Sequence, residues 1–396
     1  MPAVRILHVV HRYPPAIGGA EVCCAAIARR QAAQGHEVAV LTLRAVYDDD
    51  FEFPAGRTPR AISVGEWDVD GGVRVRRCRV AFLGAVLQKG VARTGVHTFS
   101  GPHSGELYAR VLRAAPEADV VHAHALPAPH VHGAWLAARL ARRPFVLTPY
   151  FHAGEPRHLE WPNRLVLRRA DLVVAVTPSE VAALGKLGVP AGRILRSGIG
   201  FEPVAAHPGD RQRVRRVLGV APDVPLLCFV GRKASNKGLE VLLAALPRLR
   251  HRPRPVVALA GPGSAWFSRL ALPAGVLDVV TLPEREKTAL IAAADLLVLP
   301  SHGESFGIVF LEAWAVGTPV LGADTPAVRD ALGDAGAKFR PDDAEDLAAQ
   351  IDAVLADAGA ARRRTERGRE RLAREHAWDR LADALTTAYP QALPRR

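Results

Sequence analysis

The stretch that decides the fold runs from Leu296 to Ala313 and has the sequence LLVLPSHGESFGIVFLEA. Four apolar residues followed by a Pro/Gly loop predict a buried strand that ends at Pro300. The apolar residues after the loop predict a helix that begins near Phe306. A strand, a loop and a helix in this order form the repeating unit of a parallel α/β sheet.

The same unit recurs in both halves of the chain. The first copy joins an apolar strand at Ile6–Val10, a helix at Glu21–Gln34 and a strand at His36–Leu43. Further strands are predicted at Val120–His122, Phe145–Leu147, Leu172–Val176, Leu226–Val230, Val256–Ala260 and Val279–Leu282. We therefore predict an α/β fold of two tandem Rossmann-like, doubly wound parallel sheets that face each other across a cleft.

The boundary between the two halves is predicted from composition. Gly, Pro and His cluster between Gly198 and Pro208, which is typical of a linker. We expect one domain over residues 1–199 and a second over 200–375. The remaining residues, 376–396, predict a helix with no strand after it, which we expect to cross back to the N-terminal domain.

Composition and charge exclude several classes of protein. An apolar fraction of 49% with 23% charged residues excludes a disordered chain. No run of about 18 apolar residues and no signal peptide is present, so we expect a cytoplasmic protein. The net charge is +12, but the sequence has no zinc finger, RNA-binding signature or basic tail, so we expect no nucleic-acid partner. The four cysteines lack zinc spacing and are expected to be free thiols.

Two carboxylates in the opening stretch are candidates for ligand contacts. Glu304 lies in the loop before the predicted helix, whose first N–H groups lack internal partners and attract a phosphate. Glu312 lies about two turns inside that helix among apolar residues, where a carboxylate needs a polar partner. A sugar hydroxyl is one candidate, and a solvated Glu on an amphipathic helix is the alternative.

Two further loops directly follow predicted strands. The segment Phe229–Gly238 reads FVGRKASNKG, and its Arg232 and Lys237 flank a polar turn that could face a diphosphate. Lys237 is one of only six lysines in the chain. The pair Gly18-Gly19, between the first strand and the first helix, allows a backbone to approach a ligand closely. It does not match the G-x-G-x-x-G fingerprint of dinucleotide binding.

Taken in order, these segments resemble the family-four glycosyltransferases with the GT-B fold, which are mostly retaining enzymes that use nucleotide-sugar donors. The most specific element is E-x7-E, which here runs from Glu304 to Glu312 and is followed by G-T-P-V. The G-G-A-E loop, the G-R-x4-K-G turn and the D-V-V-H-A-H and P-F-V-L-T-P segments support it. The resemblance covers nearly the whole chain.

The resemblance implies roles for particular residues. Glu304 would contact the donor sugar, Glu312 the ribose, and Arg232 and Lys237 the diphosphate. A family histidine near the reacting carbon is replaced by Tyr150, so His152 is the candidate for that role. The implied catalytic residues are thus Glu304, Arg232, Lys237 and His152, and the donor-binding residues are Gly18, Gly19, Arg232, Lys237, Glu304, Ser305, Phe306, Gly307, Ile308 and Glu312.

The predicted reaction moves a sugar from a nucleotide-diphosphate sugar to an acceptor hydroxyl, with retention and without a metal or other cofactor. The C-terminal domain would bind the donor, and the N-terminal domain would hold a small molecule, a glycan or a lipid-linked sugar as acceptor. A nucleotide-sugar epimerase of similar fold and a non-catalytic nucleotide-sugar-binding relative are the alternatives.

Three other features allow two interpretations each. Asp68-Val69-Asp70 matches a D-x-D metal motif, but the following Gly pair favours a hairpin. His122, His124, His130 and His132 could form a metal cluster, although the interpretation that one of them lines the cleft is favoured. The basic and apolar stretch from Arg74 to Arg93 could contact an anionic membrane. The alternative interpretation is a solvated strand edge followed by a core helix.

Overall fold

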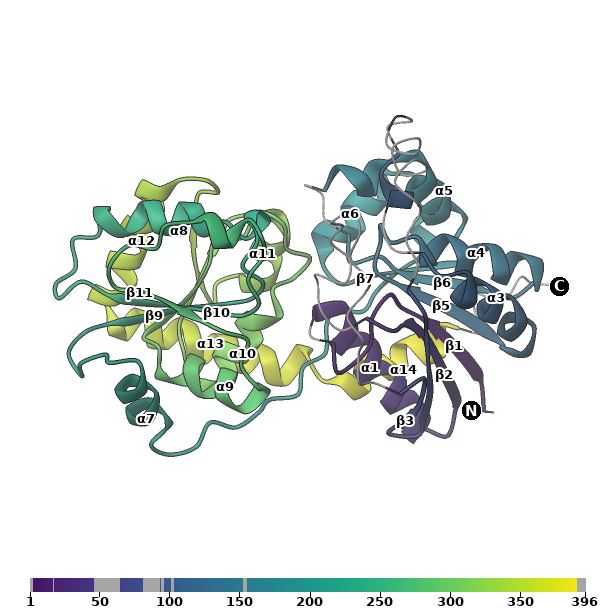
Figure 1. Cartoon of the computed structure of the whole chain (residues 1–396), viewed down its shortest axis with the longest axis horizontal. Coiled ribbons are helices and arrows are strands. Elements are labelled where there is room, and N and C mark those ends of the chain that lie inside the picture. Colours follow the sequence, from purple (N-terminus) through teal and green to yellow (C-terminus); the bar gives the residue numbers. More distant parts are fainter. Residues whose placement is uncertain are drawn as a thin grey trace. The chain divides into compact units, whose positions relative to one another are not determined.

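The chain forms two compact α/β units. The computed structural model describes residues 3–16, 18–45, 65–80, 93, 96–100, 103–151 and 155–389. The first unit contains the residues up to Gly200 and those from Trp378 onward, and the second unit is Phe201–Ala377 (Figure 1). A Cβ atom on Gly200 would collide with the indole of Trp378, so glycine allows these two segments of the first unit to pack.

The first unit is built on a mostly parallel sheet. Among the described residues its strand order is β3-β4-β2-β1-β5-β6-β7-β8. All neighbours are parallel except β3 and β4. The strands are β1 (Arg5–Val9), β2 (Glu37–Leu43), β3 (Trp67–Asp70), β4 (Val73–Cys78), β5 (Val120–His124), β6 (Phe145–Thr148), β7 (Leu172–Ala175) and β8 (Ile194–Arg196).

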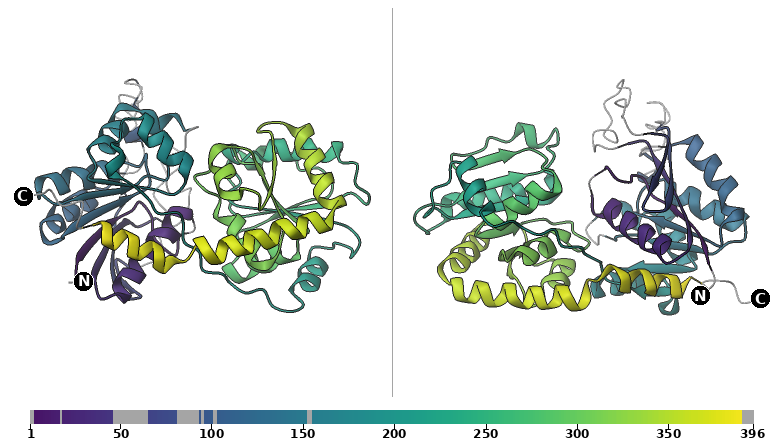
Figure 2. Two further views of the ribbon diagram at one scale, coloured as in Figure 1. Left: turned by 180° about the vertical axis from the view of Figure 1, so that it is seen from behind. Right: turned by 90° about the horizontal axis from the view of Figure 1, so that it is seen from below.

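Helices cover both faces of this sheet, as Figure 2 also shows. They are α1 (Gly19–Ala33), α3 (Gly105–Ala114), α4 (His130–Leu140), α5 (Trp161–Arg169), α6 (Pro178–Lys186) and α14 (Trp378–Ala388). Leu7 and Val9 of β1 belong to the apolar core that α3 to α6 complete. Side chains alternate along a strand, so His8 points to the opposite face, where α1 and α14 pack.

The second unit has a parallel sheet of order β11-β10-β9-β12-β13-β14. Its strands are β9 (Leu226–Val230), β10 (Val256–Ala260), β11 (Val276–Val279), β12 (Leu296–Leu299), β13 (Val320–Ala323) and β14 (Ala337–Phe339). Its helices are α7 (Asp210–Val217), α8 (Leu239–Ala245), α9 (Glu284–Ala293), α10 (Ile308–Val316), α11 (Pro326–Leu332), α12 (Ala344–Ala356) and α13 (Ala358–Glu375). The prediction of two doubly wound parallel sheets is therefore confirmed.

Of the element boundaries that differ from the prediction, two have a clear structural cause. The strand predicted at Val279–Leu282 lies at Val276–Val279 instead, because the turn at Gly275 starts it and its partner β10 ends at Ala260. The helix predicted near Phe306 begins at Ile308, because Gly307 adopts a left-handed conformation (φ 87°) at its N-cap.

The hairpin interpretation of Asp68-Val69-Asp70 is confirmed. Strands β3 and β4 pair antiparallel through Gly71 and Gly72, both of which have positive φ. Asp70 accepts a hydrogen bond from the Tyr13 hydroxyl at 2.8 Å and pairs with Arg29, so its carboxylate serves the packing of this unit.

None of the helices in the described part of the chain has both the length and the apolar composition needed to cross a bilayer. Two predictions fall where the structure gives no description. His152 lies outside the described residues, and so do residues 81–92 of the stretch predicted to touch a membrane.

Candidate functional site

Two loops of the second unit are held together at the carboxyl ends of β9 and β12. A Cβ atom on Gly238 would collide with the carbonyl oxygen of Pro300, and Gly238 also has a φ of 67°. Both observations require glycine at this position. The carbonyl oxygen of Asn236 accepts hydrogen bonds from the Ser301 hydroxyl and from the His302 amide, each at 3.2 Å. The loop after β9 is thereby fixed against the loop after β12.

This packing brings Lys237 and Glu304 into contact. The Lys237 Nζ donates a hydrogen bond to Glu304 Oε1 at 2.6 Å, and both side chains are mostly buried. A charge-assisted hydrogen bond of this length, held by two anchored loops, fixes both groups in place. Arg232 lies in the same turn as Lys237 and is exposed. The turn thus presents two cations beside a carboxylate.

A third cation in this turn, Lys233, has a structural role. Its side chain is buried, and its Nζ pairs with Asp278 and donates to the carbonyl of Val279 at 3.1 Å. The ammonium also lies over the ring of Phe267, 4.8 Å from the centroid. Lys233 therefore anchors the turn to β11, while Lys237 pairs with Glu304 and Arg232 is exposed.

The helix that follows Glu304 starts at the same edge of the sheet. Ser305 and Phe306 lead into α10, and the buried Phe306 ring packs edge-on against His376. The first amides of the helix, at Ile308 and the next residue, carry the positive end of the helix dipole. Glu304, Lys237 and this helix start therefore surround one polar region of the second unit.

Glu312 has a protein partner that the sequence did not predict. Lys287 of α9 donates to Glu312 Oε1 at 3.0 Å and also pairs with Glu284 at 2.9 Å. Glu312 Oε2 is buried and has no hydrogen-bond partner among the described residues. Burial raises the pKa of Glu312, and the charge of Lys287 opposes that rise. Lys287 is thus the polar partner of one carboxylate oxygen of Glu312, and the predicted contact of Glu312 with a sugar hydroxyl stays a prediction.

The Gly18-Gly19 loop of the first unit is braced by Glu21. A Cβ atom on Gly18 would collide with the Glu21 carboxylate, and Gly19 is the exposed first residue of α1. Arg12 donates to Glu21 at 2.7 Å, and His11 lies 3.2 Å from the same oxygen. Hydrogen bonding and charge from His11 and Arg12 outweigh burial and lower the pKa of Glu21 to about 2. The sequence pointed to Glu21 only as part of the G-G-A-E loop and did not single out His11 or Arg12.

Tyr150 occupies the position of the family histidine and is part of the core. Its backbone has a φ of 48°, and its hydroxyl is buried in contact with Cys23. Glu180 accepts from the amide of the next residue, Phe151, at 2.7 Å. Tyr150 is therefore held away from solvent, and the role predicted for His152 falls on a residue outside the described range.

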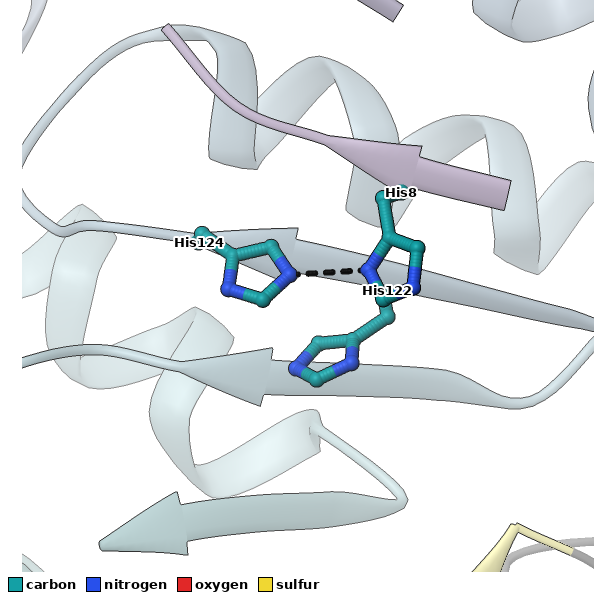
Figure 3. Close-up of side chains that lie close together, drawn as sticks. All are labelled: His8, His122 and His124. Atoms are coloured by element: carbon teal, nitrogen blue, oxygen red, sulfur yellow. Dashed lines mark hydrogen bonds between the residues drawn. The ribbon is translucent and has the colours of Figure 1, made fainter. Parts of the chain in front are cut away.

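Three histidines of the first unit form a buried cluster (Figure 3). His8 of β1 joins His122 and His124 of β5, each offering a ring nitrogen within 4.8 Å of the others. His8 Nδ1 lies 2.9 Å from His124 Nε2, and the rings of His122 and His124 stack 4.1 Å apart. Imidazole lone pairs lie in the ring plane, so these stacked rings do not point at one ion. Metal binding would require one of them to rotate.

The cluster is a hydrogen-bonded network that ties α1 and α14 to the sheet. It continues through His8 to Gln31, Gln31 to Tyr389, His122 to Tyr389 and His122 to Thr148, over 2.8–3.1 Å. His122, His124 and His130 are buried within this unit, so the one histidine predicted to line the cleft is none of these three. His132 is half-buried and bonds Asn163 at 2.9 Å.

We expect the first unit to lose stability as the pH falls below 6.5. Burial lowers the pKa of His8 to about 4 and of His130 to about 3, whereas the unfolded chain binds these protons near 6.5. These two histidines therefore cost no free energy of unfolding above pH 6.5. Below it, the free energy of unfolding falls by up to about 1.4 kcal/mol per pH unit for each histidine, until the pH reaches the pKa of that histidine in the folded protein.

The buried cysteines allow this loss to be measured in each unit. Cys23, Cys24 and Cys78 are buried in the first unit and Cys228 in the second. Unfolding in urea is followed at pH 7 and at pH 5 by labelling with a thiol reagent active at both pH values and by mass spectrometry. The urea midpoint for labelling should be lower at pH 5 for Cys23, Cys24 and Cys78 but not for Cys228. Equal shifts at Cys228 would contradict the assignment to these histidines.

The fold and these loops define a class of protein. GT-B glycosyltransferases consist of two α/β units with parallel sheets. In the second unit, a strand–loop–helix segment that carries a glutamate packs against a basic turn, as it does here. Residues 18–200 match the family described as glycosyl transferase 4-like domain, and residues 210–371 match glycosyl transferases group 1. The chain belongs to the family-four glycosyltransferases, as its resemblance predicted.

Individual relatives agree with this assignment. A D-inositol 3-phosphate glycosyltransferase from Geodermatophilus obscurus is 32% identical over 409 residues, covering 95% of this chain and 85% of that protein. A glycogen synthase from Mycobacterium tuberculosis is 29% identical over 423 residues, covering 98% and 94%. The structure of Anabaena Alr3699/HepE in complex with UDP and glucose has a similar fold, with a TM-score of 0.75 at 20% identity, covering 98% of this chain and all of that one (100%).

Proposed function

We propose that this glycosyltransferase moves a sugar from a nucleoside-diphosphate sugar to an acceptor hydroxyl, with retention of configuration and without a metal ion. The contact that carries the proposal is the Lys237–Glu304 pair at the start of α10, beside Arg232. It places cations for a diphosphate next to a carboxylate for sugar hydroxyls. The UDP and glucose bound by HepE and the glycosyltransferase names of the relatives support a donor of this class.

The cations act where charge develops. When the bond between the sugar and the diphosphate breaks, negative charge grows on the departing phosphate and positive charge on the sugar. Lys237 and the N-terminus of α10 stabilise the phosphate charge because they are fixed before the reaction starts, and Arg232 adds a second cation in the same turn. Two cations in one turn can supply the neutralisation that a divalent ion supplies in other transferases, which is why we propose a metal-independent reaction.

Retention follows from the way the acceptor proton is removed. The acceptor oxygen forms its bond to the anomeric carbon on the face that the phosphate leaves, and the departing phosphate oxygen takes the acceptor proton. No covalent nucleophile is required. Glu304 contacts the sugar in this proposal, and Glu312 accepts from the ribose with its unpartnered Oε2.

The acceptor is assigned to the first unit. We propose that His152 lies near the reacting carbon and that Gly18 and Gly19 bring backbone amides to the donor diphosphate. A small molecule, a glycan and a lipid-linked sugar are the candidate acceptors. The inositol phosphate and glycogen named for the relatives make a polyol phosphate and an α-glucan the first two acceptors to assay.

The proposal is tested by donor binding followed by transfer. Thermal shifts with UDP-, GDP- and ADP-sugars identify the donor, since a ligand at 100 times its Kd stabilises the protein by about 2.7 kcal/mol. Transfer is then followed by NMR of the anomeric proton, with and without EDTA. An inverted product or loss of activity with EDTA would contradict the mechanism. A changed sugar still attached to its nucleotide would indicate an epimerase, and tight binding without turnover a non-catalytic binder.

Glu312→Ala is expected to raise the donor KM more than it lowers kcat. A hydrogen bond to a charged group contributes about 1.5–3 kcal/mol, which corresponds to roughly a 10- to 150-fold weaker donor. Lys287→Met should also raise the donor KM, but in a way that depends on pH. Without Lys287 the pKa of Glu312 rises further, and a protonated Glu312 is a weaker hydrogen-bond acceptor for the ribose. The KM should then improve as the pH is raised.

The matched control for Lys287→Met is Lys338→Met. Lys338 is a half-buried lysine of the same unit whose Nζ donates to the carbonyl of Gly333. Initial rates at several donor concentrations between pH 6 and pH 9 separate KM from kcat for each variant. A pH-independent KM in Lys287→Met, equal to that of Lys338→Met, would contradict the role given to the Lys287–Glu312 pair.

A further inference from the structure

Helices α4 and α5 form one continuous outer surface of the first unit. His132 of α4 bonds Asn163 of α5 at 2.9 Å near their N-terminal ends. Arg139 of α4 donates to the carbonyl of Arg169 near their C-terminal ends. Bonds at both ends place the two helices side by side on one face of the sheet, where Figure 1 shows them with α3. Their outward sides face solvent.

This surface concentrates large exposed apolar side chains. Among the described residues, six of the eleven large hydrophobic side chains that are exposed lie on α3, α4, α5 or the turn before α5: Leu112, Leu136, Leu140, Leu159, Trp161 and Leu165. Trp161 is 65% exposed and Leu140 is 68% exposed. Leu136 and Leu140 are one turn apart on α4, as Trp161 and Leu165 are on α5, so the apolar side chains form stripes along both helices.

The same surface is basic. Neither α4 nor α5 contains an Asp or a Glu, and their exposed charged side chains are Arg139, Arg164, Arg168 and Arg169. Glu160, just before α5, is turned inward, where it accepts from the amides of His97 and Thr98 at 2.8 Å. Arg139 pairs with Asp171, just after α5, at 3.6 Å, whereas no acid on the helices themselves faces Arg164, Arg168 or Arg169, so the outer face keeps a net positive charge.

We propose that the outer face of α4 and α5 docks on an anionic lipid surface. Tryptophan and leucine side chains enter the boundary between headgroups and acyl chains, and interleaved arginines meet anionic headgroups. A soluble polyanion would satisfy the arginines alone and leave Trp161 and Leu140 in water. A bilayer satisfies both groups of side chains, which is the complementarity that selects it as the partner.

This surface differs from the one that the sequence predicted. In the stretch from Arg74 to Arg93, the guanidinium groups of Arg76 and Arg77 are buried and paired with Glu106 and Asp68. Arg74 alone of these three is exposed. Arg76 and Arg77 therefore stabilise the first unit and are not available to headgroups, whereas the arginines of α5 are.

The test uses the full chain and vesicles of equal parts phosphatidylcholine and phosphatidylglycerol, with phosphatidylcholine vesicles for comparison. The protein should co-sediment only with the anionic vesicles, and less so at high salt. Trp161→Gln and Arg164→Gln should each weaken this binding about fivefold, the effect of roughly one headgroup contact. Both side chains are exposed, so hydrolysis of the donor in solution should stay unchanged and report an intact fold.

Two variants elsewhere on the first unit are matched controls. Trp67→Gln removes an indole that is 63% exposed on β3, and Arg74→Gln removes an exposed arginine of the previously predicted stretch. Both should leave vesicle binding unchanged. The proposal is overturned if anionic vesicles are not bound, if the controls weaken binding as much as Trp161→Gln, or if soluble polyglutamate competes fully and Trp161→Gln has no effect. The last result would identify an acidic protein as the partner.

Discussion

Lys237→Ala is expected to lower kcat by about 10²–10³, the usual cost of removing one fixed donor that stabilises developing negative charge. Lys237 is held 2.6 Å from Glu304 by loops that Gly238 and Asn236 lock against Pro300 and Ser301. These loops therefore hold the ammonium in place before a donor binds. Single-turnover rates at saturating donor measure this step without the contribution of product release.

Two variants make the result specific to charge and position. Lys237→Arg keeps the charge but spreads it over a planar group, so it should recover part of the lost rate. Lys338→Met removes a lysine of the same unit outside these loops and should leave kcat unchanged. A Lys237→Ala enzyme with nearly the original single-turnover rate would remove the cation from the mechanism and with it the proposed metal-independent reaction.

The regular part of the fold was predictable because its signals are local. The strands β9, β10 and β12 have the predicted bounds, since each is a short apolar run bounded by Gly, Pro or polar residues. The strand β11 was misplaced because its position is set by pairing with β10, which local apolarity does not reveal. The start of α10 likewise depends on the left-handed Gly307, which the apolar pattern around it hides.

The candidate site was predictable only as far as its loops. The strand ends identified Glu304, Lys237 and Arg232, because ligands bind at the carboxyl edge of such sheets. Lys287 escaped notice because its contact with Glu312 joins two helices 25 residues apart in sequence. One signal was present: four of the chain's six lysines lie in the second unit, and three of them, Lys233, Lys237 and Lys287, pair with carboxylates.

The histidine cluster shows a stronger limit of the same kind. His122 and His124 are two residues apart, so a shared strand face was foreseeable. Their contact with His8 depends on the order of strands in the sheet, which places β1 beside β5 with His8 opposite His122. Gln31 of α1 and Tyr389, which directly follows α14, also belong to the network. Tyr389 is 267 residues from His122 in sequence. Such networks arise from tertiary packing and leave no periodic signal.

Glu304→Gln is expected to lower kcat by about 10², since an uncharged amide stabilises a cation-like sugar far less than a carboxylate does. The same change should tighten the binding of the free nucleoside diphosphate about fivefold. Glu304 occupies Lys237 in the unliganded protein and repels a diphosphate, and a neighbouring unit charge in water contributes roughly 1 kcal/mol.

Opposite signs in two measurements therefore separate the partners of one ion pair. Lys237→Ala should weaken both catalysis and diphosphate binding, whereas Glu304→Gln should weaken catalysis and strengthen diphosphate binding. Calorimetric titration of the product nucleotide into each variant provides the second measurement. If Glu304 only held Lys237 in place, Glu304→Gln would weaken the binding of the nucleotide as Lys237→Ala does, because a misplaced ammonium binds phosphate poorly. Tighter binding with slower transfer is consistent only with a carboxylate that acts on the sugar.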